Sequence, residues 1–214
     1  MTKRLKILTS HITFCNTFAD VGCDHGLVSK FVLDNSLASE VIATDISKKS
    51  LDKAIKLLGD KPNFTAICCD GFNGIKNVVD QAIISGMGGE EIVKILKDAK
   101  DIPNRLILSP QKNSYKVRKF LVDNFYKITN DYTIFDDKFY DIIVAEKGKD
   151  FYTENELIFG KDNLKNLPCD FTLKIKSEIN LKMQVLKTPN LSSENKESVL
   201  NEVKKLKEII NEDY

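Results

Sequence analysis

The sequence predicts an α/β fold with a mostly parallel sheet, helices on both faces, a terminal antiparallel strand pair and a helical tail. Three observations predict it. Short β-rich runs alternate with amphipathic runs over residues 17–124, two β-rich runs follow one another over 126–148, and charge-rich sequence with helical periodicity begins after residue 149. Strands that alternate with helices imply right-handed crossovers and a parallel sheet.

The first element is a leading helix over residues 3–14. Leu5, Leu8 and Ile12 recur at helical spacing there, with basic side chains spread around them. Five parallel strands follow, predicted at 17–21, 41–45, 64–68, 81–85 and 105–109. The helices between and after them are predicted at 27–35, 48–58, 90–99 and 115–124.

The rhythm changes after the fifth strand. The runs 126–135 and 138–148 are separated only by Asp136 and Asp137, so they are expected to pair antiparallel as a hairpin. Together the strands make a seven-stranded sheet. A dinucleotide-dependent dehydrogenase would continue in parallel strand–helix units, so this order counts against one.

The tail is predicted to form two antiparallel helices in a coiled-coil-like arrangement. Two stripes predict it: Leu173, Lys174, Ile175, Ile179, Met183 and Leu186, then Val199, Val203, Leu206 and Ile210. Ser192 and Ser193 are candidate N-caps of the second helix. The expected organisation is one domain over residues 1–150 and a helical region over 151–214.

Composition excludes several classes of protein. The 214 residues, 42% of them hydrophobic, suffice for one good-sized domain, and 32 basic against 31 acidic residues leave no global field. The five cysteines and two histidines show no metal-ligand spacing, and no segment has the length of a signal peptide core or membrane span. We expect a cytoplasmic monomer with free thiols, without metal or membrane attachment.

The stretch "FADVGCDHGLVSK" (18–30) predicts a ligand-binding turn between the first strand and its helix. A carboxylate, Asp24, stands where a pyrophosphate would need bare backbone, and it would repel that group. S-adenosylmethionine carries a sulfonium and an ammonium and no phosphate, so an acidic loop suits it. The alternative is that Asp24 only N-caps the next helix. The predicted cofactor residues here are Asp20, Gly22, Cys23, Asp24, His25 and Gly26.

Two further strand ends carry carboxylates at the same edge of the sheet. Asp45, followed by Ile46, is placed to accept both ribose hydroxyls of an adenosine. Asp70, followed by Gly71, is placed near the adenine amino group. The alternatives are a solvated carboxylate or N-cap for Asp45 and a simple turn for Asp70.

The fourth strand ends in "SGMGGEE" (85–91), where three glycines allow the backbone to pass close to a ligand. An Asp/Asn-Pro-Pro-aromatic motif, which grips an exocyclic amine, is absent, and no cysteine nucleophile stands here. Pro168-Cys169 falls outside the strand order. Ser85 and Gly86 are therefore candidates for acceptor contact, and Ser85 is also a predicted cofactor residue, with a structural glycine turn as the alternative.

A basic segment, "SPQKNSYKVRKF" (109–120), follows the fifth strand. Basic residues beside an aromatic ring suit phosphates and a stacked base, although a solvated helix face would look the same. The predicted RNA-binding residues are Lys112, Tyr115, Lys116, Arg118 and Lys119, with Arg4 and Lys6 extending the patch if the leading helix folds over the crevice.

These motifs, in order, resemble the bacterial tRNA adenine-N1 methyltransferases of the TrmK type, which modify adenine 22. The resemblance rests on "ADVGCDHG", "IISGMGGEEI", "LILSPQKNSYKVRKFL" and "DIIVAEKG" and covers nearly the whole chain. It implies a class I, Rossmann-like seven-stranded methyltransferase sheet with a C-terminal coiled coil, S-adenosylmethionine as cofactor and tRNA as partner.

The acceptor that the resemblance implies sets the chemistry. Adenine N1 holds a lone pair at neutral pH, so catalysis would consist mostly of positioning and desolvation. The product ring is cationic, which makes Asp24 and the backbone of Ser85 and Gly86 candidate catalytic groups. Two other classes stay open: a catalytically silent RNA-binding module on the same sheet, and a nicotinamide-dependent oxidoreductase, which Asp24 and the terminal hairpin disfavour.

Overall fold

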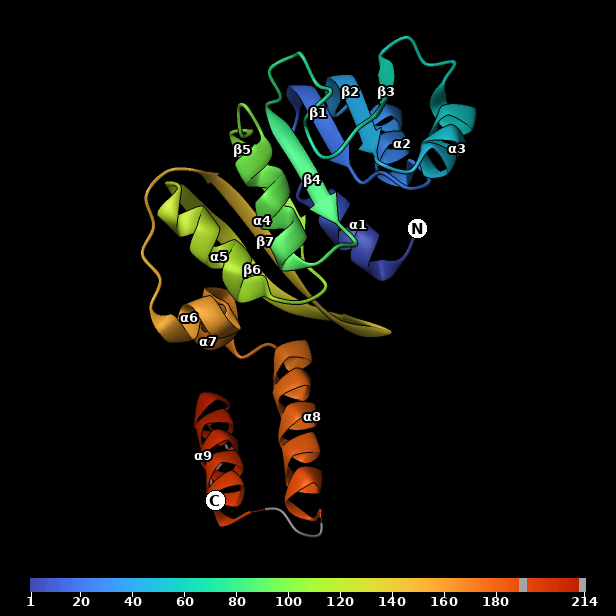
Figure 1. The fold of residues 1–214 in the computed structure, drawn as a ribbon. Coiled ribbons are helices and arrows are strands. Elements are labelled where there is room, and N and C mark those ends of the chain that lie inside the picture. The colour runs from blue at the N-terminus through green and yellow to red at the C-terminus, as the bar shows by residue number, and fades with distance from the viewer. Residues whose placement is uncertain (189–191, 212–214) are drawn as a thin grey trace.

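The computed structural model describes residues 1–188 and 192–211. Within them the strands form one seven-stranded sheet of order β3-β2-β1-β4-β5-β7-β6 (Figure 1). The strands are β1 (Cys15–Val21), β2 (Ala38–Asp45), β3 (Phe64–Cys68), β4 (Gln81–Ser85), β5 (Arg105–Ser109), β6 (Tyr126–Asp136) and β7 (Lys138–Lys147). The seven-stranded sheet predicted from the sequence is confirmed.

The strand directions are also as predicted. Strands β1 to β5 pair parallel, and β7 inserts antiparallel between β5 and β6. The hairpin between β6 and β7 turns at Asp137, whose φ of 62° is the left-handed conformation that Asp tolerates better than most residues. Antiparallel insertion places Ile143, in the middle of β7, beside Leu108 near the carboxyl end of β5.

Helices cover both faces of the sheet because neighbouring strand residues point in opposite directions. Ile83 packs in the core under α1 and α2, whereas Ile84 packs in the core under α4 and α5. Helix α3 joins the first layer through a small cluster around Ala54. The five helices are α1 (Lys3–Ser10), α2 (Leu27–Asp34), α3 (Lys48–Leu58), α4 (Gly89–Asp98) and α5 (Ser114–Asp123).

The C-terminal region holds four helices in the described residues, where the sequence predicted two. They are α6 (Glu154–Phe159), α7 (Lys161–Asn166), α8 (Cys169–Leu186) and α9 (Ser193–Ile209). The short α6 packs against α5 and α7 packs against β6, whereas α8 and α9 extend away from the sheet (Figure 1). The boundary at residue 150 stays a prediction.

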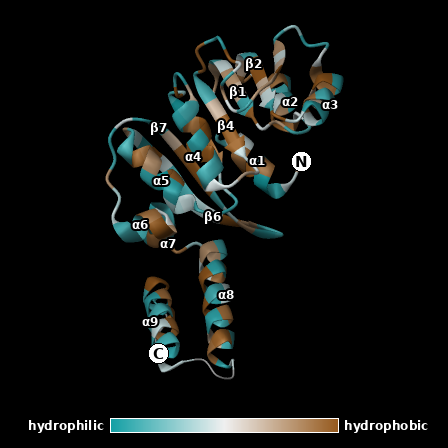
Figure 2. Ribbon diagram, in the orientation of Figure 1, coloured by the Kyte–Doolittle hydropathy of each residue, from teal (hydrophilic) through white to brown (hydrophobic). Residues whose placement is uncertain are grey.

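Helices α8 and α9 pair antiparallel, as predicted. The start of α8, with Phe171 and Ile175, shares a core with the end of α9, with Leu206 and Ile210. Figure 2 shows hydrophobic and hydrophilic residues mixed along both helices. Ser192 caps α9 by accepting a hydrogen bond from the amide of Asn195. Leu173 and Met183 were expected in the α8 stripe, but the structure exposes them. Part of the predicted linker, 189–191, lies outside the described residues.

Candidate active site

A cavity of about 450 Å³ opens at the carboxyl ends of β1, β2 and β4. Strand β1 lies between β2 and β4, so this is the point where the strand order reverses, the usual ligand site of open α/β sheets. All but one of the predicted cofactor residues line it, and they are Asp20, Gly22, Cys23, Asp24, His25, Asp45, Ile46, Asp70, Gly71 and Ser85. Gly86, predicted on the acceptor side, lines it too.

Gly26 is the exception, because it serves packing instead. Its φ is 70°, and a Cβ at this position would meet the Ala54 side chain at 2.9 Å. Gly26 also occupies the N-cap position of α2. A glycine at this position lets α2 approach α3 closely while the chain turns from strand to helix.

Asp20 caps α2 from the end of β1. Its Oδ2 accepts hydrogen bonds from the Ser29 amide at 3.0 Å and the Ser29 hydroxyl at 2.7 Å. Burial raises the pKa of this carboxyl to about 6, and the two hydrogen bonds from Ser29 only partly oppose the shift. The capping role that the sequence offered as the alternative for Asp24 therefore belongs to Asp20.

Asp24 lies at the mouth of the cavity in a left-handed backbone conformation, with φ 46°. Its side chain is 63% exposed, and its Oδ2 lies 2.5 Å from His25 Nδ1. On the other side of the imidazole, Lys53 Nζ donates to His25 Nε2 at 3.0 Å. These contacts fix the direction of the Asp24 carboxylate while leaving it open to a ligand.

Asp45 holds the loop in shape. Its Oδ2 accepts from the Asp24 amide at 3.1 Å, and its Oδ1 accepts from the Ser47 amide at 2.7 Å. Each carboxylate oxygen has more than one lone pair, so Asp45 keeps acceptor capacity for hydroxyl groups. Asp70 forms an exposed ion pair with Lys94 at 3.2 Å.

The end of β4 forms the opposite wall. Gly86 has φ 85°, and a Cβ built there would meet no described atom within 4 Å, so the backbone faces open space. The Gly86 carbonyl accepts from Gln111 Nε2 at 2.7 Å. This bond ties the glycine turn to the loop after β5.

The structure adds Arg4 to the cavity, because α1 lies beside the mouth. Its guanidinium carbon lies 4.5 Å from the Tyr140 ring centroid, and its Nη1 is buried without a hydrogen-bond partner among the described residues. The sequence predicted Arg4 as an RNA contact. The packing of α1 against the cavity is a tertiary contact, which the local sequence periodicity does not predict.

The basic segment is only partly a surface patch. Arg118 is fully buried, bound to Asp131 and Asp141, so the expectation that it contacts RNA is corrected. Lys112, Lys116 and Lys119 are exposed. Lys116 pairs with Glu90, and Lys119 with Asp123 at 3.2 Å.

Lys6 is exposed on α1, and Tyr115 is half-buried against the core beneath α4 and α5. The described residues contain no group of three or more His, Cys, Asp or Glu side chains arranged to hold a metal ion. None of the described helices combines the length and apolar character that crossing a membrane requires.

The sheet order and the acidic cavity at its switch point define a class I, Rossmann-like methyltransferase. The family model of TrmK, tRNA (adenine(22)-N(1))-methyltransferase, matches residues 18–212. The chain belongs to this family, so it is an S-adenosylmethionine-dependent enzyme that methylates N1 of adenine 22 in tRNA.

Individual relatives agree. The Bacillus subtilis (strain 168) tRNA (adenine(22)-N(1))-methyltransferase is 31% identical over 156 residues, which are 69% of this chain and 66% of that protein. The crystal structure of B. subtilis TrmK matches with a TM-score of 0.84 at 25% identity, covering 98% of each chain. M. capricolum TrmK, solved with S-adenosylhomocysteine, matches with a TM-score of 0.88 at 24% identity over 99% and 98% of the two chains.

Proposed function

We propose that the cavity at the carboxyl ends of β1, β2 and β4 binds S-adenosylmethionine, and that adenine N1 reaches it from the side of Ser85 and Gly86. The observation that carries this assignment is the set of carboxylates around one cavity of about 450 Å³, contributed by Asp20, Asp24, Asp45 and Asp70. A cofactor with two cationic groups and no phosphate fits such a lining.

The donor residues have distinct tasks. Asp45 is placed to accept the ribose hydroxyls while it holds the Asp24 amide. Asp70 and Gly71 lie beyond it, where the adenine of the cofactor would rest. Asp20 presents buried negative charge beside the cationic portion of the ligand.

When bound, the cofactor supplies a methyl group activated by the positive sulfur. The attacking N1 has a lone pair, so the chain needs no general base and works by holding the acceptor in line and excluding water. Asp24 is the candidate for stabilising the positive charge that develops on the adenine ring, because its carboxylate is held by His25 and remains exposed. The backbone of Ser85 and Gly86 completes that wall.

The acceptor must leave the tRNA stack, since N1 lies on the pairing edge of adenine. Lys6, Lys112, Lys116 and Lys119 are proposed to bind the RNA backbone, and α8 and α9 are proposed to form a coiled coil that supports the tRNA body. The monomeric state and the cytoplasmic location expected from the sequence stay predictions.

The test uses unmodified tRNA transcript and labelled S-adenosylmethionine, with the product mapped as a reverse-transcription stop. The expected result is one methyl group at adenine 22. Label that goes to protein or to a small molecule, with none on tRNA, would contradict the proposal.

Asp24→Ala assigns the role of that carboxylate. If Asp24 acts on the acceptor, turnover falls on the order of 100-fold while calorimetric binding of S-adenosylhomocysteine changes less than about threefold. Loss of binding with an unchanged turnover at saturation would make Asp24 a cofactor residue instead. Asp52→Ala, an exposed carboxylate on α3, is the matched control.

A further inference from the structure

A second cavity, of about 320 Å³, lies beside the first. The loop between β5 and α5, the start of β7, α6 and α8 all contribute to it, so it joins the sheet to the C-terminal helices. Side chains that decide its chemistry are Gln111, Lys112, Tyr115, Phe139, Ile158 and Lys174. Its volume falls within the range of about 300–1,000 Å³ that small-molecule sites occupy.

The two cavities share a wall. Gln111 Nε2 donates to the Gly86 carbonyl at 2.7 Å, and the Gln111 amide donates to the Met87 carbonyl at 2.9 Å. The Gly89 amide in turn donates to the Lys112 carbonyl at 2.8 Å. Gly86 and Met87 line the first cavity, whereas Gln111 and Lys112 line the second. The two cavities are therefore adjacent, with this hydrogen-bonded wall between them.

The chemistry of the lining suits one nucleotide. Tyr115 and Phe139 offer aromatic rings, and Ile158 adds an apolar surface. The positive charges come from Lys112 and from Lys174, whose side chain is 35% exposed. The carboxylate of Asp141 also faces this cavity and pairs with Arg118 at 3.3 Å and with Lys174 at 3.0 Å, so Lys174 would contact a phosphate through the ammonium hydrogens that Asp141 does not use.

We propose that this second cavity binds the nucleotide next to the target adenine, with its base against the aromatic wall and its phosphate near the two lysines. The inference rests on the proposed function, because it needs an RNA strand at the first cavity. It gives α8 a direct part in substrate binding through Lys174. Base stacking on aromatic side chains is the common way in which proteins hold an unpaired base.

The experiment is a double-mutant cycle between protein and RNA. Two tRNA transcripts carry an abasic site immediately 5′ or 3′ of the target adenine, and kcat/KM is measured for the unaltered chain and for Phe139→Leu. We expect one abasic site, and Phe139→Leu on normal tRNA, each to lower kcat/KM by about tenfold. Combined, they lower it no further than either alone, because both remove the same contact.

The control variants change the same residue types at positions that do not line the second cavity. Phe125→Leu and Lys127→Met change exposed residues at the other end of the β6–β7 hairpin from Phe139, and both are expected to leave kcat/KM within about twofold. Lys174→Met supplies a second variant: its KM for tRNA rises and its salt dependence weakens by about one unit of log–log slope, while kcat is retained. Calorimetry with S-adenosylhomocysteine verifies that each variant retains the first cavity.

Two outcomes overturn the inference. In the first, the losses of kcat/KM caused by the abasic site and by Phe139→Leu multiply on both transcripts. In the second, Lys174→Met has the same KM for tRNA and the same salt dependence as Lys127→Met. If the unaltered chain methylates normal tRNA, either result refutes the nucleotide site at the second cavity and does not affect the proposed function. Absence of any methylation of normal tRNA by the unaltered chain would instead remove the proposed function itself.

Discussion

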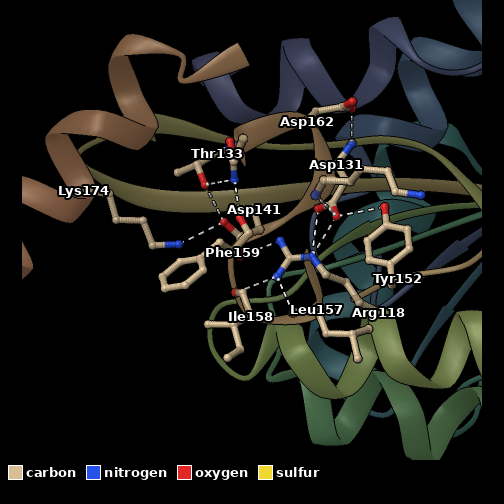
Figure 3. Close-up of polar contacts among 12 residues, drawn as sticks. Arg118, Asp131, Thr133, Asp141, Tyr152, Leu157, Ile158, Phe159, Asp162 and Lys174 are labelled. Carbon is tan, nitrogen blue, oxygen red and sulfur yellow. Dashed lines mark hydrogen bonds and ion pairs between the residues drawn. The ribbon is translucent and has the colours of Figure 1, made fainter. Parts of the chain in front are cut away.

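Two acidic regions of this molecule use their carboxylates in opposite ways. At the cavity beside β1, β2 and β4, Asp24 accepts from His25, Asp45 accepts from two backbone amides, and both carboxylates remain open to a ligand. Between α5, the β6–β7 hairpin and the C-terminal helices, Asp131 and Asp141 are buried with Arg118 (Figure 3). The first region keeps binding capacity, and the second has its charges balanced within the protein.

The buried region is an extensively hydrogen-bonded cluster around one guanidinium. Arg118 Nε donates to both oxygens of Asp131 at 2.9 and 3.0 Å, and Nη2 donates to Asp141 at 3.3 Å. Nη1 donates to the carbonyls of Leu157 and Ile158, both at 3.2 Å, which anchors the end of α6 (Figure 3). The cluster therefore fastens the C-terminal region to the sheet.

The charges in this cluster support one another. Burial alone would raise the pKa of Asp141, but Arg118 and Lys174 hold it below its ordinary value. The carboxylates of Asp131 and Asp141 oppose the effect of burial on Arg118, so the pKa of its guanidinium is raised. The buried charges around Arg118 are paired with one another and hold parts of the fold together. The carboxylates around the first cavity keep acceptor capacity that a ligand can use.

Arg118→Met is the strongest way to break the comparison. It leaves two buried carboxylates without their main partner, so we expect the free energy of unfolding in urea to fall by about 3–5 kcal/mol. In folded samples, binding of S-adenosylhomocysteine is expected to stay within about threefold, because the cavity residues do not contact Arg118. Lys119→Met, one position along α5, is the exposed control. Unfolding free energies that match for the two variants would contradict the structural role of the cluster.

The sequence could not reveal this cluster. Arg118 lies among lysines in a basic run, and its partners Asp131 and Asp141 stand on the following two strands. Only the folded hairpin brings them together. The strands themselves were predictable, because β4 (Gln81–Ser85) and β5 (Arg105–Ser109) are short apolar runs whose signal is local.

The cavity and the short helices also differ in how far the sequence predicts them. Carboxylates at strand ends were predictable, since parallel strands bring their carboxyl ends to one edge. Helix α6 was missed because six residues carry too little periodicity. Its capping box, in which Thr153 and Glu156 bond reciprocally, was the available signal.

Asp20→Asn sharpens the comparison through pH. The pKa of Asp20 is raised from 3.8 to about 6, so between these values the folded state binds more protons than the unfolded state. Stability from this group is therefore lost as pH rises from about 4 to 6. Above pH 6 the cost of the buried charge is up to about 3 kcal/mol.

The variant keeps an amide oxygen as acceptor for Ser29 but has no charge to bury. In urea unfolding, its stability relative to the unaltered chain is expected to increase from pH 4 to pH 7. Asp52→Asn, on the exposed face of α3, is the control. If the stability difference between Asp20→Asn and the unaltered chain does not change with pH, the raised pKa of Asp20 does not contribute to the pH dependence of stability.

Asp45→Asn tests the open region directly. The amide can still accept from one neighbouring backbone amide, but the charge that we propose favours the ribose hydroxyls is gone. We expect the Kd for S-adenosylhomocysteine, measured by calorimetry, to rise by roughly 10–100-fold. The Tm is expected to shift by less than about 4 °C, the reverse of the Arg118→Met pattern. A large Tm loss with unchanged Kd would make Asp45 a structural residue and erase the contrast.

The smallest effect on stability is expected from Lys116→Met combined with Lys119→Met. Both side chains are about half exposed, and their ion pairs with Glu90 and Asp123 lie at the surface. Surface pairs contribute little, so the Tm is expected to stay within about 2 °C of the original.

Binding to tRNA should respond although stability does not. If these lysines meet phosphates, the plot of log affinity against log salt concentration becomes shallower by roughly one unit for each lysine removed. Lys127→Met, an exposed lysine at the start of β6, is the control. An unchanged slope would favour the solvated helix face, and α5 would then contribute only its buried residues, with Arg118 joining the sheet to the tail.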